Sequence, residues 1–406
     1  MYGKLLSLVL LVSAPVGLTQ AACNVADAAG ADIYDARVFN WHYYVNQNAD
    51  LLQAGITSTT AIRNHWKNYG LCEGRIAHPD FHSVQYLNLY ADLRTAFGNN
   101  YAKALRHYII NGIGEGRRGY DANAASGTYG RWVARNDIIS VSTSPRVAGA
   151  VDSVFWGGRE FINSYDHGRQ LQPALSKNGH GECFNPTLAG NRADGVRTTT
   201  TSVLEGAWAS GSAMATQTLP AFWLEPFTTD WCGPVINTTR LSNYRINTHL
   251  QVGLSGMRHA IRFQTQVYVP EAVNSLVIEA PTGYLAGDFT AFYTYDVVTQ
   301  ALTPLSASLP AGEQGKPLVL STPSGSHAMG VWSPGLPHIP NIGYGQFRFP
   351  GGTESQATMK WNAVYRTGAV AAGTYLHYTS YVAVGSRENV RVTLAQLYAA
   401  WRNGQL

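Results

Sequence analysis

The spacing of hydrophobic and polar residues divides the chain into two parts. Before residue 120, aromatic residues such as Phe39, Tyr43 and Tyr44 recur at helical spacing. After residue 137, short apolar runs alternate with turns, and the segment 263–269 alternates between apolar and polar positions. A period of two is typical of a strand with one buried face. The pattern therefore predicts a helical N-terminal part and a β-rich C-terminal part.

The C-terminal part is expected to form one large antiparallel β-sandwich over 137–406, so the chain as a whole is mainly β. Almost no helices lie between the predicted strands, which excludes a parallel βαβ architecture. One helix is expected over 393–402. The strands are expected over 138–141, 147–156, 261–269, 275–279, 290–295, 373–378 and 381–384.

The N-terminal part contains an internal duplication. Segments 39–75 and 81–117 match one another without a gap at an offset of 42 residues. A fixed period of this length predicts two copies of one structural unit. We therefore expect two 42-residue helical repeats over 35–119, followed by a linker over 120–136 that is rich in Gly, Ala, Asn and Ser.

Each repeat is expected to end in a Glu-Gly-Arg turn. Gly70 should end the second helix of the first unit, and Gly74 should adopt a positive φ while its charged neighbours pair. The aromatic residues either form the core of the unit or stack on sugars, and helical spacing favours the core. The Glu-Gly-Arg pattern resembles repeats appended to many secreted bacterial hydrolases and adhesins, which implies an accessory module.

The N-terminus predicts export. Residues 1–22 have the layout of a signal peptide, with Lys4 before an apolar stretch and small residues at Ala21 and Ala22. The apolar stretch is too short to span a bilayer, and no later segment is long and apolar enough. We expect a secreted protein, extracellular or periplasmic. Because cleavage would expose Cys23, a lipoprotein is the alternative.

The four cysteines suggest disulfides, since exported proteins oxidise their thiols. We favour Cys23–Cys72 and Cys183–Cys232, because each bridge then stays within one region. Charged residues make up 13% of the chain, the net charge is +4, and no basic run occurs, so a nucleic-acid partner is not expected. No cofactor is expected either.

Two segments carry a resemblance to a known class. The sequence GAVDSVFWGGREFINSYDHGRQLQ (149–172) resembles the start of galactose-mutarotase-like super-sandwich domains. The sequence TYLHYTSYVAVGSRENVRVTLAQLY (374–398) resembles the late strand and closing segment of the same class. The resemblance implies a concave sheet face presented to a sugar. Members of the class include epimerases, hydrolases, lyases and proteins that only bind.

The densest polar cluster is expected to hold the chemistry. On a strand, His167 and Arg169 would share a face, where Arg could bind a sugar carboxylate and His could transfer a proton. Asp166 lies beside them, and Glu182 would be the partner carboxylate. The structural alternative pairs Asp166 with Arg169 and uses His167 to cap a turn. Metal binding by these donors is not expected, because Cys183 is better used in a disulfide and no tight ligand spacing is present.

Further candidates follow predicted strands, where loops gather around a cleft. Glu279 or Glu225 could be the second carboxylate of a glycosidase pair, although either could equally be an exposed strand end. The residues expected to contact substrate are Gln172, Asn185, Trp223, Tyr284, His327 and Trp332.

These features favour a carbohydrate-active enzyme that cleaves an extracellular polysaccharide. Hydrolysis needs two carboxylates, whereas a lyase needs a His or Tyr base and a group that neutralises a uronate. The sequence does not choose between them. The alternative is a non-catalytic glycan-binding or surface-attachment protein.

Overall fold

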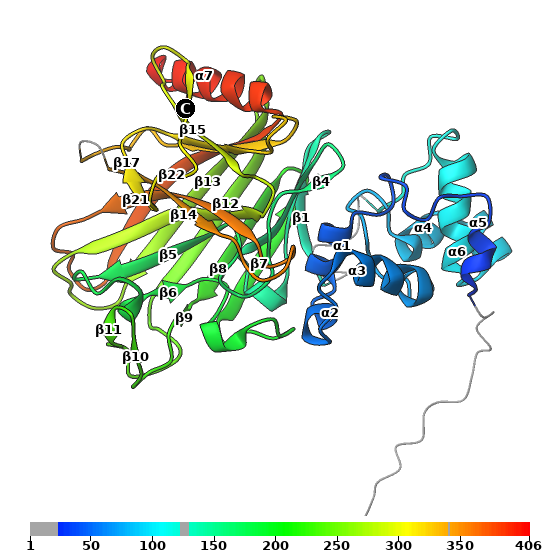
Figure 1. Ribbon diagram of the computed structural model, residues 1–406, viewed down its shortest axis with the longest axis horizontal. Coiled ribbons are helices and arrows are strands. Elements are labelled where there is room, and N and C mark those ends of the chain that lie inside the picture. The colour runs from blue at the N-terminus through cyan, green and yellow to red at the C-terminus, as the bar shows by residue number, and fades with distance from the viewer. Residues whose placement is uncertain (1–22, 122–129, 340–341) are drawn as a thin grey trace, which may run out of the picture.

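The computed structural model describes residues 23–121, 130–339 and 342–406. The predicted signal peptide (1–22) and part of the predicted linker therefore lie outside the described residues. A helical N-terminal part lies beside a larger β part (Figure 1). Within the described ranges, no helix is long and apolar enough to cross a membrane.

The helical part contains two similar sets of elements. Each set has three short α-helices and a terminal π-helical turn. The first set is α1 (Trp41–Gln47), α2 (Asp50–Gln53), α3 (Thr59–His65) and the turn Trp66–Gly70; the second is α4 (Ser83–Leu89), α5 (Ala91–Phe97), α6 (Tyr101–His107) and the turn Tyr108–Gly112.

The aromatic residues of both sets form a core. Tyr44 and Tyr86 are completely buried at equivalent positions. Tyr44 Oη lies 2.9 Å from Nδ1 of His65, and Tyr86 Oη lies 2.9 Å from Nδ1 of His107. A buried phenol needs such a partner. The interpretation of these aromatics as core residues is confirmed.

The Glu-Gly-Arg turn behaves as predicted, but Gly70 does not. Gly74 has a φ of +69°, and Arg75 pairs with both Glu73 (2.5 Å) and Asp50 (2.7 Å). Gly70 instead ends the π-helical turn without a positive φ. A Cβ atom there would lie 1.9 Å from Tyr44 Oη, so close packing, and not backbone conformation, requires glycine.

The β part is built on two large antiparallel sheets. The nine-stranded sheet has the order β16-β15-β18-β19-β22-β13-β12-β8-β7, and the seven-stranded sheet has the order β17-β20-β21-β14-β5-β6-β9. The strands of the first are β7 (Val203–Ser210), β8 (Ala213–Leu219), β12 (Arg245–Leu254), β13 (Met257–Val269), β15 (Ala291–Tyr295), β16 (Leu302–Pro304), β18 (Leu318–Ser321), β19 (Ala328–Trp332) and β22 (Thr374–Gly385). Those of the second are β5 (Gln172–Lys177), β6 (Pro186–Thr187), β9 (Ala221–Phe222), β14 (Leu276–Ala286), β17 (Gly312–Gln314), β20 (Tyr344–Phe349) and β21 (Thr358–Arg366).

Smaller elements complete the β part. A four-stranded sheet has the order β1-β2-β3-β4, and β10 pairs with β11. Their bounds are β1 (Trp132–Arg135), β2 (Ile139–Thr143), β3 (Val151–Trp156), β4 (Arg159–Glu160), β10 (Thr229–Asp230) and β11 (Gly233–Pro234). Short 3₁₀ turns lie at Val25–Ala28, Pro145–Val147, Gly181–Phe184 and Arg192–Asp194.

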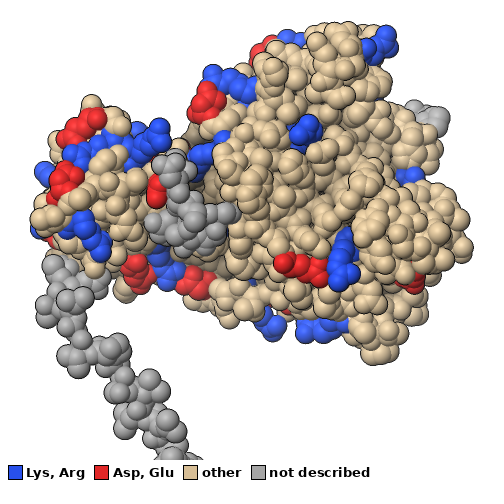
Figure 2. Space-filling view, turned by 180° about the vertical axis from the view of Figure 1, so that it is seen from behind, with Lys and Arg blue, Asp and Glu red and all other residues tan. Residues whose placement is uncertain are grey.

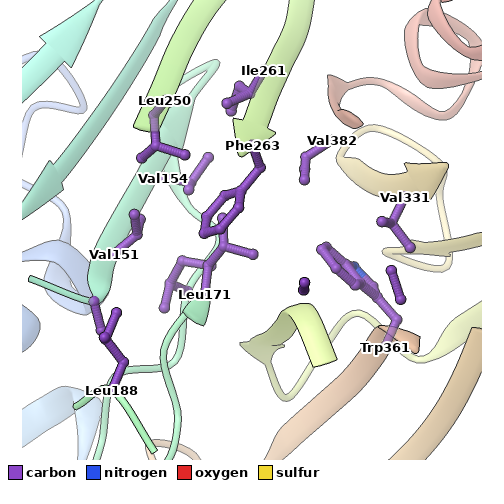
Figure 3. Close-up of a cluster of buried hydrophobic side chains, with 14 of the residues drawn as sticks. Val151, Val154, Leu171, Leu188, Leu250, Ile261, Phe263, Val331, Trp361 and Val382 are labelled. Atoms are coloured by element: carbon purple, nitrogen blue, oxygen red, sulfur yellow. The ribbon is translucent and has the colours of Figure 1, made fainter. Parts of the chain in front are cut away.

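The two large sheets enclose one hydrophobic core. Phe263 of β13 and Trp361 of β21 point toward each other's sheet, with Val331 and Val382 beside Trp361 (Figure 3). All four side chains are at most 1% exposed. The predicted mainly β fold with an antiparallel sandwich is therefore confirmed. The predicted strands 373–378 and 381–384 are one continuous strand, β22, whose residues 374–383 pair with β13 without a register shift; its polar residue Ser380 is buried and bonds Ala280 O at 2.6 Å.

Helix α7 (Arg387–Arg402) covers part of the outer face of the nine-stranded sheet. It begins six residues before the predicted start, because Ser386 and Asn389 form a capping box. Val390 and Leu394 pack in one cluster with Ala383 of β22. The helix lies at one end of the β part (Figure 1), so the rest of this outer face is left open.

The helical part docks on the four-stranded sheet. Asn46 of α1 donates to Ile162 O at 2.8 Å, and the rings of Tyr43 and His78 both contact Phe155 of β3. Lys, Arg, Asp and Glu gather on the helical part, whereas the β surface in the same view carries few charges (Figure 2). Each charged side chain on this β surface therefore stands among mostly uncharged residues.

Candidate functional site

His167, the predicted proton-transfer group, is completely buried. Its Nδ1 lies 2.8 Å from Gly195 O, and its Nε2 lies 3.0 Å from Arg146 O. Burial, and then the charge of Arg146, lowers the pKa of His167. Both ring nitrogens are thus occupied by the main chain, which leaves neither for a substrate.

The neighbours of His167 follow the structural alternative. Arg169 Nε pairs with Asp166 Oδ2 at 3.1 Å, and its Nη1 donates to Thr358 Oγ1 at 2.9 Å. Gln172 is buried. Its Nε2 donates to Gly168 O at 3.2 Å, and its Oε1 accepts from the backbone N–H of Ala189, which lies in the connection between β6 and β7. These polar groups bind parts of the fold to one another.

Two other predicted residues meet on the seven-stranded sheet. Lys360 Nζ of β21 pairs with Glu279 Oε2 at 3.1 Å and lies 5.0 Å from the centre of the Tyr284 ring. Burial raises the pKa of Tyr284, although the charge of Lys360 opposes this. Glu279 therefore already has a cationic partner and is not a free second carboxylate.

The remaining predicted residues are dispersed. Glu182 accepts from Trp231 Nε1 at 3.2 Å, and Asn185 Oδ1 accepts from Thr187 Oγ1 at 3.0 Å. Trp223 packs against Gly168, where a Cβ atom would lie 2.6 Å from its ring. His327 contacts Ser326 and Gly157 O. Trp332 is 3% exposed and packs in the α7 cluster, so it offers no open face to a sugar.

Both predicted disulfides are present. The Cα atoms of Cys23 and Cys72 are 5.3 Å apart, and those of Cys183 and Cys232 are 5.8 Å apart. Each bridge stays within one part of the chain, which confirms the favoured pairing. Among the residues that the structure describes, no cluster of three or more His, Cys, Asp or Glu side chains could hold a metal ion.

A groove lies on the open outer face of the nine-stranded sheet. It has a volume of about 540 Å³ and is lined by residues of β7, β8, β12, β13 and β22. We call it the outer-face groove. Of the site residues predicted from sequence, none belongs to its lining.

Strand register builds this groove from residues far apart in the chain. His249 of β12 lies opposite Gln264 of β13, which lies opposite Thr379 of β22. In the next row, Asn247, Gln266 and His377 are aligned in the same way. Because side chains alternate along a strand, these residues face outward while Leu250 and Phe263 face the core.

The floor of the groove carries amides and imidazoles with unused hydrogen-bonding capacity. Asn247 Nδ2 donates to Gln266 Oε1 at 2.7 Å. Asn247 Oδ1 and His249 Nδ1 are buried atoms without a hydrogen-bond partner among the described residues. Buried polar atoms are normally satisfied, so such atoms at the bottom of a groove point to a ligand or water that would satisfy them.

Aromatic rings border the groove. Trp208 of β7 is 50% exposed and is aligned with the His249 row through Ala215 of β8. Tyr268 and Tyr375 lie one register step beyond the Asn247 row, with ring centres 5.0 Å apart. Exposed rings of this kind combine an apolar face with a polar edge or hydroxyl, which suits contact with a sugar.

No Asp or Glu lines the groove, among the residues that the structure describes. Glu205 of β7 lies beside it, but its carboxylate accepts from Arg245 Nε at 3.0 Å and from Gln217 Nε2 at 3.2 Å. A pair of free carboxylates facing one bond is therefore not present in this lining.

The sequence contained a signal for this site. In segment 245–254, polar Asn247, His249 and Gln251 alternate with apolar Ile246, Leu250 and Val252. Gln264 and Gln266 alternate similarly in 263–269. A half-buried strand was predicted from the second pattern, but its exposed polar row was not identified as a site. The position of His377 on the same face could not be known without the strand order.

Comparisons with known proteins give a likeness in structure alone. No family model and no curated protein matches the chain. A galactose mutarotase related enzyme from Lactobacillus acidophilus matches with a TM-score of 0.36 and 12% identity, over 63% of this chain and 98% of that one. A heparan sulfate lyase from Pedobacter heparinus has a TM-score of 0.38 at 9% identity, over 74% and 41%. A 4-alpha-glucanotransferase from Thermococcus litoralis has a TM-score of 0.40 at 9% identity, over 85% and 50%.

Proposed function

We propose that the protein binds a polysaccharide in the outer-face groove and cleaves it with histidine as the group that takes a proton from the sugar and that protonates the leaving oxygen. The observation that carries the proposal is the row of outward-facing amides and imidazoles between Trp208 and the Tyr268–Tyr375 pair. Amide and imidazole groups exchange hydrogen bonds with sugar hydroxyls, and the rings provide stacking surfaces.

His249 and His377 are the groups we assign to proton transfer. An imidazole is suited to this role because its ordinary pKa lies near neutrality. The two residues are on strands β12 and β22, with only β13 between them. Strands are spaced about 4.8 Å apart and the two residues lie one row apart, about 7 Å along the strands, so their backbones are about 12 Å apart, and their side chains could contact adjacent sugars of one bound chain.

Two-carboxylate hydrolysis is less well supported at this groove. That reaction needs an acid and a second carboxylate on opposite sides of the scissile bond. Glu205, the carboxylate beside the groove, is held by Arg245 and Gln217. Histidine-based cleavage is therefore the better assignment of the two enzyme classes that the sequence left open.

Non-catalytic glycan binding is the second candidate. A catalytic base is usually oriented by a third group bonded to its other nitrogen. His249 Nδ1 has no such partner among the described residues. This observation favours a groove that binds a glycan without cleaving it. The variants His249→Asn and His377→Asn distinguish the two candidates.

The test combines binding and cleavage on the full chain. A panel of neutral and acidic polysaccharides is screened for reducing ends and for unsaturated products. We expect cleavage to be lost in His249→Asn and in His377→Asn while binding changes by less than about tenfold. His327→Asn is the matched control, because His327 lies outside the groove.

Three results would decide against parts of this proposal. Cleavage that survives both groove variants would remove the histidines from the reaction. Binding without cleavage in the parent protein would select the second candidate. A Trp208→Ala variant that binds every glycan as the parent does would show that the groove is not the binding site.

A further inference from the structure

Arg262 of β13 borders the outer-face groove. It points outward on the same strand face as Gln264, two residues further along, which lines the groove. Two residues along a strand cover about 7 Å, which is within reach of an arginine side chain. In register, Arg262 lies opposite Gln251 on β12 and Tyr381 on β22.

Within the described ranges, no carboxylate pairs with Arg262, and its Nε is a buried atom without a hydrogen-bond partner. Arg245, on the same sheet face, shows the contrast, because its Nε lies 3.0 Å from Glu205. A buried guanidinium N–H that lacks a partner destabilises a fold. An anion bound from outside would satisfy this N–H and neutralise the guanidinium.

The charge of the groove supports the same conclusion. None of its described lining residues is acidic, and the adjacent guanidinium is not neutralised within the described structure. A concave site bordered by one sign of charge concentrates ligands of the opposite sign. The planar guanidinium presents a fork of donors that fits carboxylate or sulfate oxygens.

We propose that the outer-face groove is selective for anionic glycans and that Arg262 binds their acidic group. The inference rests on the proposed function, since it names the substrate class of the same groove. The amides of Asn247 and Gln264 then contact hydroxyls, while Arg262 holds a carboxylate or a sulfate.

The experiment measures binding to matched pairs of oligosaccharides by calorimetry. One pair is an oligouronate and the same oligosaccharide with its carboxyl groups reduced to alcohols. The other pair is a sulfated galactan oligosaccharide and its desulfated form. The variants are Arg262→Gln and Arg262→Lys, and Arg94→Gln on α5 is the control with the same change in net charge.

We expect at least one charged oligosaccharide to bind more tightly than its neutral partner, and Arg262→Gln to weaken that binding by about 10- to 100-fold, which is the range of a charged hydrogen bond. Arg262→Lys should retain part of the affinity, and Arg94→Gln should retain all of it. Whichever pair shows the difference identifies carboxylate or sulfate as the recognised group. Equal thermal unfolding of the variants shows that folding is unchanged.

The failure of this inference differs from the failure of the proposed function. If neutral oligosaccharides bind as tightly as charged ones, or if Arg262→Gln weakens both equally, the anionic selectivity is refuted while the groove remains a glycan site. If no oligosaccharide of either kind binds, the proposed function fails.

Discussion

Replacing Gly70 by alanine should destabilise the first repeat through one contact. The added Cβ would lie 1.9 Å from Tyr44 Oη and 2.9 Å from Cζ, whereas a comfortable contact is roughly 3.5 Å. Tyr44 is completely buried and bonds His65 at 2.9 Å, so the ring must move and weaken that bond. Overpacking costs about 1–3 kcal/mol and a lost hydrogen bond about 1 kcal/mol, while the better helix propensity of alanine returns up to about 1 kcal/mol. We expect a net loss of about 1–3 kcal/mol.

Hydrogen exchange of the α3 amides is the assay, because it reports the first repeat separately from the β part. Gly112→Ala should have a smaller effect on the second repeat, since its Cβ would lie 2.3 Å from Tyr86 Oη. Gly368→Ala is the control, because a Cβ there meets nothing within 4 Å. Combining Gly70→Ala with Tyr44→Phe should recover part of the loss. The reasoning is refuted if the free energy of opening of the α3 amides in Gly70→Ala equals that in the Gly368→Ala control within about 0.5 kcal/mol.

Three further predictions concern the β part. Burial raises the pKa of Glu160 to about 8 from 4.5, so the native state keeps a proton that the unfolded chain releases. The contribution of Glu160 to the unfolding free energy should therefore fall as pH rises from about 4.5 to 8 and then level off. It is measured as the difference between the parent and Glu160→Gln in denaturant unfolding at each pH, and a difference that does not change with pH would contradict the assignment. His167→Ala should lower the unfolding midpoint, because the buried ring and the hydrogen bond from its single N–H to a backbone carbonyl are lost, yet glycan binding at the groove should persist in a pull-down assay. Removing the Cys183–Cys232 bridge by serine substitution should destabilise the protein by about 2–5 kcal/mol, and a reducing agent should have no added effect on that variant.

Local patterns predicted the elements that local physics determines. Alternation identified β13, whereas α7 starts at Arg387 and not at residue 393, because the capping box of Ser386 and Asn389 was not recognised in the sequence. The Glu-Gly-Arg turns followed from glycine's freedom at positive φ, as Gly74 shows at +69°. Gly70 could not be explained in this way, because its reason is a tyrosine that lies 26 residues earlier in the chain.

The polar cluster at 166–172 shows why residue type alone misplaced the chemistry. A run of Asp, His, Arg and amides looks available for catalysis in a chain with few charges. In the fold, both ring nitrogens of His167 face backbone carbonyls, and Arg169 pairs with Asp166. A segment that must satisfy buried carbonyls recruits the same residue types as an active site, and only the contacts distinguish the two uses.

The outer-face groove could not be assembled from sequence, because its rows cross strands that are not adjacent in the chain. His249 and Gln264 belong to a hairpin and could be paired by local reasoning, but His377 joins them only because β22 lies next to β13. Likewise, Arg262 can be identified as an arginine without a carboxylate partner only after the fold has paired the nearby acidic residues with other arginines, as Glu205 is paired with Arg245. An unpaired charge is a property of the whole fold and not of a motif. The search for function in this chain therefore begins with the groups that folding leaves unsatisfied on an open sheet face.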